Sequence, residues 1–341
     1  MNNSKEMVLV TGASGWIAQF CIVELIRNGF YVRGSLRHMA RQQEVIDAVS
    51  REVDPTNMLE FCKLDLLKDG GWDDAMNGCK YVLHLASPFV MEDPKDENEL
   101  IEPAREGTLR AMKAAKKAGV TRIVVTSSIA AILAHVREGT VDANLWTDLK
   151  DPSVNVYQKS KTLAEKAAWD FIDTQDKKDA LELSVINPGG VMGPTLGTDI
   201  KGVSLDICSQ LLTGKMSGIP NLHICMIDVR DVAMLHVKAM TLPQAKNRRF
   251  ISAHSKPTPF LEMAQTLKDS GYNVTTKKVP SLMLKIVGLF NSEAKSMVPF
   301  IDRYVNCDIS ETEKVFNWKP IPLKKSFLDM AKSVKAVLDS Q

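Results

Sequence analysis

The chain has 341 residues, of which 45% are hydrophobic and 25% are charged, and its formal net charge is +2. These values are ordinary for a soluble globular protein and exclude a disordered, collagen-like or coiled-coil chain. A net charge so close to zero provides no general attraction to nucleic acid or to an anionic membrane, so we expect neither as a partner.

Six cysteines are widely spaced and none forms a CxxC pair. This predicts buried or free thiols rather than a disulfide framework or a zinc site. The longest apolar run, 279–290, is too short for a membrane span and carries Lys285. The first residues do not have the pattern of a signal peptide. We therefore expect a cytoplasmic protein with reduced thiols.

The first half of the sequence alternates short apolar runs with segments of helical periodicity. Strands are predicted at 7–12, 30–35, 58–62, 81–86, 122–127 and 181–186, and helices at 16–28, 39–53, 73–76, 97–118 and 156–172. Strands that alternate with helices predict an α/β, Rossmann-type fold, in which a doubly wound parallel sheet is covered on both faces.

A glycine-rich turn, TGASGWIA at 11–18, joins the first predicted strand to the first helix. Small residues allow the backbone to turn sharply and approach a pyrophosphate, and the helix N-terminus offers unpaired N–H groups and a positive dipole end. The spacing of Gly12, Gly15 and Ala18 therefore predicts a dinucleotide site. The alternative is an ordinary strand–helix turn.

The end of the second strand distinguishes NADP from NAD. NAD sites of this type carry an acidic residue about 20 residues after the glycines, where it binds the ribose 2′-hydroxyl. Here that position is Ser35, and Arg37 and Arg41 follow it. Because an arginine can bind a 2′-phosphate with two hydrogen bonds, the sequence favours NADP(H) with Arg37 as the ligand. The alternative is that Arg33, Arg37 and Arg41 are solvated surface charges.

After Pro188 the pattern becomes irregular and rich in Gly, Pro, Thr and Ser, before mixed helices follow. We interpret residues 1–188 as a dinucleotide-binding domain, with a return segment at about 223–252, and residues 189–341 as a smaller mixed C-terminal lobe that binds the substrate. Within the return segment, Asp228 or Asp231 is expected to begin a helix rather than to act as an acid.

Tyr157 and Lys161 lie four residues apart at the start of a predicted helix and therefore share one face. A phenol has a pKa of about 10, and a nearby ammonium lowers it, so that Tyr157 can exchange a proton with a carbonyl or alcohol oxygen. Ser127 and Ser128 follow the fifth strand. We favour Ser128 as the group that orients the carbonyl, because successive strand residues point to opposite faces. The alternative is a tyrosine packed on a lysine stem.

These motifs occur together with Asp65–Leu66, HLASP at 84–88, YQKSKTLAEKAAW at 157–169 and NPGGVMGP at 187–194. In this order they resemble an extended short-chain dehydrogenase/reductase. The pattern is most similar to the dihydroflavonol reductase-like group, which includes cinnamoyl-CoA reductases and microbial aldehyde and ketone reductases. The resemblance implies an NADPH-dependent oxidoreductase that reduces ketone or aldehyde carbonyls to alcohols, with hydride from the nicotinamide and a proton from Tyr157.

The resemblance also implies roles for individual residues. Ser128, Tyr157 and Lys161 match the catalytic triad. The cofactor-binding matches are Gly12, Gly15, Trp16 and Ile17 at the pyrophosphate, Arg37 at the 2′-phosphate, Asp65 and Leu66 at the adenine, Ala86 and Ser87 beneath the nicotinamide ribose, and Pro188 and Val191 against the nicotinamide ring.

A small-molecule carbonyl substrate is expected in an apolar pocket, which suits aryl or medium alkyl groups. The residues expected to line it are Phe89, Ile129, Met192, Leu205 and Met226. One region departs from the family: residues 103–108 contain no asparagine to complete a proton relay, so a backbone carbonyl or a water is expected there.

Two other functions remain open. A nucleotide-sugar epimerase or dehydratase usually retains NAD and needs polar and basic residues for a diphosphate. A non-catalytic NADP-sensing protein typically loses the Tyr/Lys pair. The histidines show no metal-ligand spacing, so no metal is expected, and His84 is expected to be buried and hydrogen-bonded. The chain is compatible with a monomer or a homodimer.

Overall fold

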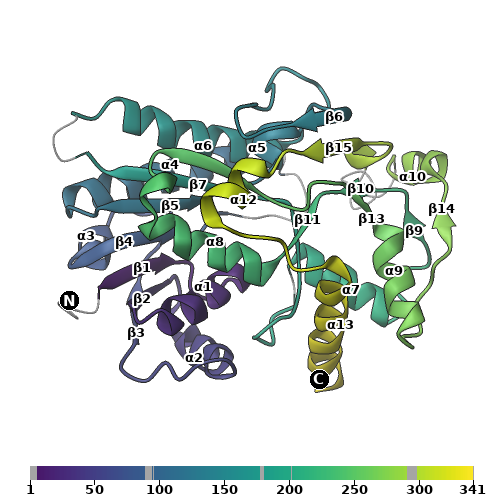
Figure 1. The fold of residues 1–341 in the computed structure, drawn as a ribbon, viewed down its shortest axis with the longest axis horizontal. Coiled ribbons are helices and arrows are strands. Elements are labelled where there is room, and N and C mark those ends of the chain that lie inside the picture. Colours follow the sequence, from purple (N-terminus) through teal and green to yellow (C-terminus); the bar gives the residue numbers. More distant parts are fainter. Residues whose placement is uncertain are drawn as a thin grey trace.

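The computed structural model describes residues 6–88, 94, 96–176, 180–200, 202–289 and 298–340. At its centre lies a seven-stranded parallel sheet with the strand order β12-β7-β5-β4-β1-β2-β3 (Figure 1). Its strands are β1 (Met7–Thr11), β2 (Tyr31–Leu36), β3 (Leu59–Lys63), β4 (Cys79–His84), β5 (Arg122–Thr126), β7 (Glu182–Pro188) and β12 (Arg248–Ser252). The winding direction reverses between β1 and β4, where ligands of such sheets bind at the carboxyl edge. The predicted Rossmann-type fold is confirmed.

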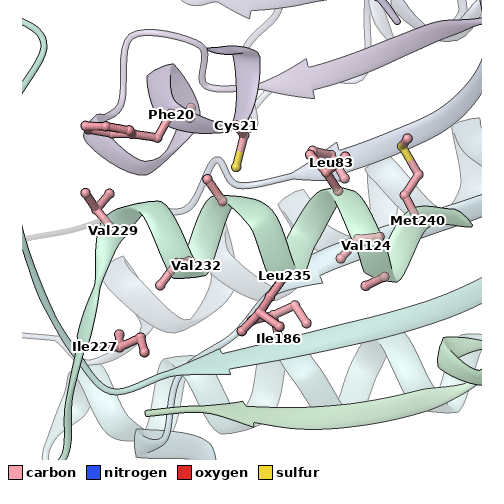
Figure 2. Close-up of a cluster of buried hydrophobic side chains, with 14 of the residues drawn as sticks. Phe20, Cys21, Leu83, Val124, Ile186, Ile227, Val229, Val232, Leu235 and Met240 are labelled. Atoms are coloured by element: carbon pink, nitrogen blue, oxygen red, sulfur yellow. The ribbon is translucent and has the colours of Figure 1, made fainter. Parts of the chain in front are cut away.

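Helices cover both faces of the sheet. One face carries α1 (Trp16–Arg27), α2 (Gln42–Ser50) and α8 (Val229–Thr241), and the other carries α3 (Trp72–Met76), α4 (Asn98–Lys117) and α6 (Val156–Asp173). Alternation along β1 shows why: Val8 and Val10 enter the core beneath α1 and α8, whereas Leu9 enters the opposite core. Each side chain buried in this way stabilises the fold by about 1.5–3 kcal/mol. Figure 2 shows the core around α8, including Leu83 and Val124 from the sheet.

The second half of the chain adds a smaller mixed lobe, which lies to the right of the sheet in Figure 1. Its helices are α7 (Val203–Leu212), α9 (Phe260–Asp269), α10 (Ser281–Val287) and α13 (Leu323–Asp339), and its strand pairs are β9 (Ile219–Pro220) with β14 (Lys278–Val279) and β10 (His223–Ile224) with β13 (Thr258–Pro259). α7 and α9 pack against α13 around the fully buried Phe327 and Met330. The lobe therefore has its own hydrophobic core.

Two short strand pairs lie between the sheet and the lobe. β8 (Gly190–Met192) pairs with β11 (Met226–Asp228), and β6 (Glu138–Val141) pairs with β15 (Tyr304–Cys307). The chain returns to the main sheet through α8, and Asp228 caps this helix by accepting a hydrogen bond from the Arg230 N–H at 2.9 Å, as predicted. The domain boundaries at 188 and at about 223–252 stay a prediction.

The remaining elements are short. They are α5 (Ala130–Leu133), α12 (Ser310–Phe316) and the 3₁₀ turns η1 (Met39–Arg41), η2 (Pro243–Ala245) and η3 (Val298–Phe300). The helix predicted over 39–53 is thus divided into η1 and α2. All six cysteines lie in the described ranges and carry free thiols. Within those ranges, no helix is both long and apolar enough to cross a bilayer.

Candidate active site

Helix α6 begins with a capping box that fixes its first turn. The Asn155 side chain accepts a hydrogen bond from the Gln158 N–H, and the Gln158 side chain accepts one from the Asn155 N–H, both at 2.9 Å. Such a box satisfies two N–H groups that a helix start would otherwise leave unpaired. Tyr157 and Lys161 lie within and just after this turn, so their backbone positions are set by the cap.

The structure brings Ser128, Tyr157 and Lys161 together at the carboxyl edge of the sheet. The side chains of Ser128 and Tyr157 are hydrogen-bonded to each other. Lys161 Nζ donates to Ser87 Oγ at 3.0 Å and lies 5.8 Å from the centre of the Tyr157 ring. A hydroxyl, a phenol and an ammonium are thereby gathered around one point, which is the arrangement needed to bind and protonate a carbonyl oxygen.

The protonation states differ in one respect from the expectation. Burial raises the pKa of Tyr157, and the hydrogen bond from Ser128 only partly opposes this. Burial also lowers the pKa of Lys161 to about 8. The expected lowering of the Tyr157 pKa is therefore wrong for this structure, because desolvation of the buried phenol has the largest effect. Tyr157 consequently keeps its proton at neutral pH and is ready to donate it.

Ser127 points away from Ser128 toward a buried carboxylate. Glu165, with 0% side-chain exposure, accepts hydrogen bonds from Ser127 Oγ at 2.5 Å and from Asn187 Nδ2 at 2.7 Å. Arg249 supplies the positive charge, with its Nε 2.7 Å from the Glu165 carboxylate and its guanidinium stacked 3.7 Å from the centre of the Trp146 ring. We call these five residues the Glu165 cluster.

The Glu165 cluster contacts the catalytic triad through the backbone of Ser128. Asn187 Nδ2 also donates to the backbone carbonyl of Ser128 at 3.1 Å, so the cluster holds the backbone of that residue. Sequence reasoning missed Glu165 and Asn187. A signal was present, because Glu165 follows Lys161 by four residues and shares its helix face, but its partners come from β7 and β12, which no local pattern connects to it.

The glycine-rich turn after β1 is tightly fitted. Gly12 has φ +68°, and a Cβ built on it would lie 3.1 Å from the Ala86 Cβ and 3.2 Å from the Ala86 Cα. The Gly12 N–H donates to Ser35 Oγ at 3.2 Å, and the Ala13 N–H donates to the Ser35 carbonyl at 2.9 Å. Only glycine fits this position, and the turn leads directly into the N-terminus of α1, as a pyrophosphate cradle requires.

The three arginines near β2 have different surroundings. Arg33 donates to Glu60 and to the carbonyls at the end of α3, and Arg41 pairs with Glu44 and Asp199. Arg37 is exposed at the end of β2, and among the described residues it has no hydrogen-bond or ion-pair partner. Of the three, only Arg37 is therefore available to a 2′-phosphate.

The other predicted cofactor residues follow the ends of neighbouring strands. Asp65 and Leu66 come after β3 and are partly buried, and Ala86 comes after β4, where its N–H donates to Thr11 Oγ1 at 3.0 Å. Further positions are Trp16 and Ile17 in the first turn of α1, Ser87 beneath Lys161, Pro188 at the end of β7 and Val191 in β8. All of them lie at or near the carboxyl edge where the topology predicts a ligand.

The expected substrate pocket is less clearly defined. Ile129 is partly buried next to Ser128, whereas Met192, Leu205 and Met226 are 0–3% exposed and belong to the core of the lobe. Phe89 lies outside the described residues. The assignment of this pocket stays a prediction.

A small cavity of about 10 Å³ lies behind Lys161, lined among others by His84, Thr108 and Glu165. This volume is at the lower limit for one water molecule. Thr108 stands in the segment that lacks the family's asparagine, so a water is a suitable link there. A larger cavity of about 520 Å³ lies beyond β12, and none of the predicted catalytic residues lines it.

His84 is 3% exposed, and its Nδ1 is hydrogen-bonded to Thr11 Oγ1 at 3.0 Å, as expected for a structural histidine. Burial and the nearby Lys161 lower its pKa to about 4, so it is neutral at pH 7. In the part of the chain that the structure describes, no group of His, Cys, Asp or Glu could hold a metal ion.

A Rossmann sheet with a glycine-rich turn after β1 and a Tyr–Lys pair on α6 defines an extended short-chain dehydrogenase/reductase. Residues 8–251 match the model of the NAD dependent epimerase/dehydratase family, and the chain belongs to this family.

Individual relatives show which members of the family the chain is similar to. The chain is 32% identical to the putative NADPH-dependent methylglyoxal reductase GRP2 of Candida albicans, over 96% of this chain and 98% of that one. It is 36% identical to cinnamoyl-CoA reductase 1 of Petunia hybrida, over 72% of each. The crystal structure of yeast methylglyoxal/isovaleraldehyde reductase Gre2 with NADPH matches with a TM-score of 0.79 and 25% identity, covering 98% of this chain and 100% of that one. The predicted resemblance to the dihydroflavonol reductase-like group is confirmed.

Proposed function

We propose that the protein is an NADPH-dependent reductase that converts an aldehyde or ketone carbonyl to an alcohol. The observation that carries this proposal is the geometry of three residues: the Tyr157 hydroxyl is hydrogen-bonded to Ser128, and the ring of Tyr157 lies beside Lys161 Nζ. The relatives named as NADPH-dependent methylglyoxal reductase and cinnamoyl-CoA reductase support the same reaction class.

The residues present fit NADPH. The tight turn at Gly12, where a Cβ would press against Ala86, leads into the α1 N-terminus and suits a pyrophosphate. Arg37, which has no partner among the described residues, suits the 2′-phosphate that distinguishes NADPH from NADH. Lys161, held over Ser87, would bind the nicotinamide ribose. When bound, the cofactor supplies the hydride. An epimerase that retains NAD is less favoured, because an arginine rather than an acid follows β2.

The chain's own residues perform the rest of the reaction. Ser128 donates a hydrogen bond to the carbonyl oxygen and holds it next to the Tyr157 hydroxyl. Tyr157 gives its proton to that oxygen as negative charge develops there. The Lys161 ammonium then stabilises the phenolate that Tyr157 becomes. The Glu165 cluster holds the Ser128 backbone, so that the oxygen and the phenol stay aligned.

The substrate is a small carbonyl compound, and Ile129 with Met192, Leu205 and Met226 would favour an aryl or medium alkyl group. The free thiols suit a reducing compartment, and we place the protein in the cytoplasm as a monomer or homodimer without a nucleic-acid or membrane partner.

The test follows the oxidation of NADPH and of NADH with a panel of aryl and alkyl aldehydes and ketones. Tyr157→Phe is expected to lower kcat by about 100- to 10,000-fold, the usual contribution of a general acid. Tyr272→Phe, a tyrosine of the lobe outside the site, serves as the matched control and should retain full activity. Absence of turnover with every carbonyl, in a protein that still binds NADPH, would refute the proposal.

The pH profile provides an independent check. Lys161, with a pKa of about 8, loses its charge above that pH, whereas Tyr157 keeps its proton. The rate of reduction should therefore be level between pH 6 and about 8 and fall above it, by up to about tenfold per unit. Alcohol oxidation, which needs the Tyr157 phenolate, should rise with pH over the same range. A reduction rate that increases through pH 9 would contradict these assignments.

A further inference from the structure

Arg303 is a buried cation that has no carboxylate partner in the described part of the chain. It precedes β15 and is 4% exposed, and its buried Nε and Nη2 atoms have no hydrogen-bond partner among the described residues. No carboxylate among the described residues forms an ion pair with it. The neighbouring Asp302 does not neutralise it, because the Asp302 carboxylate accepts hydrogen bonds from Asn221 and Ser281 instead, each at 3.3 Å.

A second arginine and two cysteines lie near Arg303. Burial and the nearby Arg137 lower the pKa of Arg303 to about 10, and Cys307 and Cys225 partly oppose this effect. Nearby, the His223 ring packs at a tilt of 46° against the Tyr304 ring, with 4.6 Å between the ring centres, and among the described residues its buried Nδ1 also has no hydrogen-bond partner. A charged guanidinium is rarely retained in a protein interior unless it is paired or binds a ligand.

The residue before Arg303 forms a left-handed turn. Asp302 has φ +54°, a left-handed conformation that aspartate and asparagine adopt more often than other non-glycine residues. Across this turn the Asp302 side chain is bonded to residues of the lobe, whereas the next side chain, Arg303, is buried.

The position of Arg303 relates it to the proposed active site. β15 pairs with β6, and β6 follows Ser128 and α5 directly along the chain. On the other side, Arg303 is next to Cys225, whose carbonyl accepts a hydrogen bond from the Gly190 N–H at 2.9 Å in the segment that follows β7. Arg303 thus lies near chain segments that follow the carboxyl ends of β5 and β7. Figure 1 shows β6 and β15 side by side where the sheet meets the lobe.

We propose that Arg303 binds an anionic group of the substrate, a carboxylate or a phosphate, so that the enzyme acts on carbonyl compounds that carry such a group. A planar guanidinium matches either anion with two parallel hydrogen bonds. Arg137, which is exposed, lies on the solvent side and would attract the anion toward the buried charge. The proposal rests on the proposed function, because it assumes that the protein reduces carbonyls.

A different counter-charge must be considered. Cys225 and Cys307 are hydrogen-bonded to each other beside Arg303, and the pKa of Cys225 is lowered by this bond and by the arginine. A Cys225 thiolate would neutralise Arg303 without any ligand. The two explanations predict different substrate preferences, because a guanidinium already neutralised by a thiolate would not distinguish an acid from its ester.

The test compares pairs of substrates that differ only in charge: 2-, 3- and 4-oxo acids with their methyl esters, and dihydroxyacetone phosphate with dihydroxyacetone. In the native enzyme, kcat/KM is expected to favour the charged member of at least one pair. Arg303→Met should reduce that preference by about 100-fold, as expected when one partner of a buried charge pair is lost. The carboxylate and phosphate arms identify which anion fits.

Controls separate the possible failures. Arg248→Met changes a partly exposed arginine that pairs with Glu311, and it should leave the preference unchanged. If Arg303→Met does not fold, Arg303→Lys keeps the charge but loses the fork and should reduce the preference by about tenfold. Turnover of the neutral compounds without any preference for the charged ones, or an unchanged preference in the Arg303 variants, would overturn the anion site. Absence of turnover with all compounds would refute the proposed function instead.

Discussion

Two buried arginines, Arg249 and Arg303, show opposite solutions to the same electrostatic problem. The Arg249 side chain is 10% exposed, pairs with the fully buried Glu165 and stacks on Trp146. Arg303 is 4% exposed and has no carboxylate partner among the described residues. Because an unpaired charge in the interior costs several kcal/mol, the difference matters: Glu165 compensates the charge of Arg249, whereas the charge of Arg303 calls for a further group.

The comparison teaches how to separate structural charges from functional ones. A third buried arginine, Arg122, resembles Arg249: it pairs with Glu182 and donates to the carbonyls of Ala239 and Leu242. The two arginines with ion-pair partners, Arg122 and Arg249, hold strands and helices of the main domain together. Arg303, which has no such partner among the described residues, lies at the junction with the lobe, where the substrate is expected.

The largest expected loss of stability follows when Arg249 loses its ion-pair partner and, like Arg303, becomes an unpaired buried charge. Glu165→Gln removes the carboxylate and leaves the Arg249 guanidinium buried without a counter-charge, so the free energy of unfolding should fall by about 3–5 kcal/mol. Urea denaturation measures the loss. Glu182→Gln is the matched control, and its loss should be smaller because Arg122 keeps two carbonyl acceptors and Glu182 is 19% exposed. Equal losses would show that burial of the pair is not decisive.

A gain in stability is expected when the unpaired charge of Arg303 is removed. Arg303→Met should raise the free energy of unfolding of the ligand-free protein by about 1–3 kcal/mol, because an apolar side chain of similar length replaces an unpaired cation. Arg249→Met should lower it, because Glu165 would then be left unpaired. If calorimetry found that both variants lose stability to the same extent, the distinction between the two arginines would fail.

The smallest effect concerns the aromatic face beneath Arg249. Trp146→Leu removes a ring 3.7 Å from the guanidinium carbon and should destabilise the protein by about 1 kcal/mol, the range of a partly desolvated cation–π contact. Trp146→Phe keeps a ring and should lose less. A double-mutant cycle with Arg249→Met isolates the contact, and a coupling free energy near zero would mean that the stacking is incidental.

Local patterns in the sequence were sufficient for the sheet, its helices and the Tyr157–Lys161 pair. Strand alternation, the turn at Gly12 and the spacing of four residues are all short-range signals. They were insufficient wherever partners come from distant segments. Glu165 meets Ser127, Asn187 and Arg249 only after β5, β7 and β12 have assembled, and Arg303 becomes notable only because no described carboxylate forms an ion pair with it.

Two further expectations failed or stayed open for physical reasons. The direction of the Tyr157 pKa depends on how deeply the phenol is buried, which spacing does not reveal. Met192, Leu205 and Met226 were expected to line a pocket, and they are found in the lobe core. Apolar residues serve a core and a binding site equally well, so composition alone does not separate the two.

The capping box at the start of α6 has a consequence for the order of events in the catalytic cycle. Because Asn155 and Gln158 close the first turn through their own side chains, Tyr157 is in place before any ligand arrives. The conformational entropy of this turn is therefore lost during folding rather than at each encounter with a substrate. The enzyme therefore begins each turnover with the backbone of its proton donor, Tyr157, already in position.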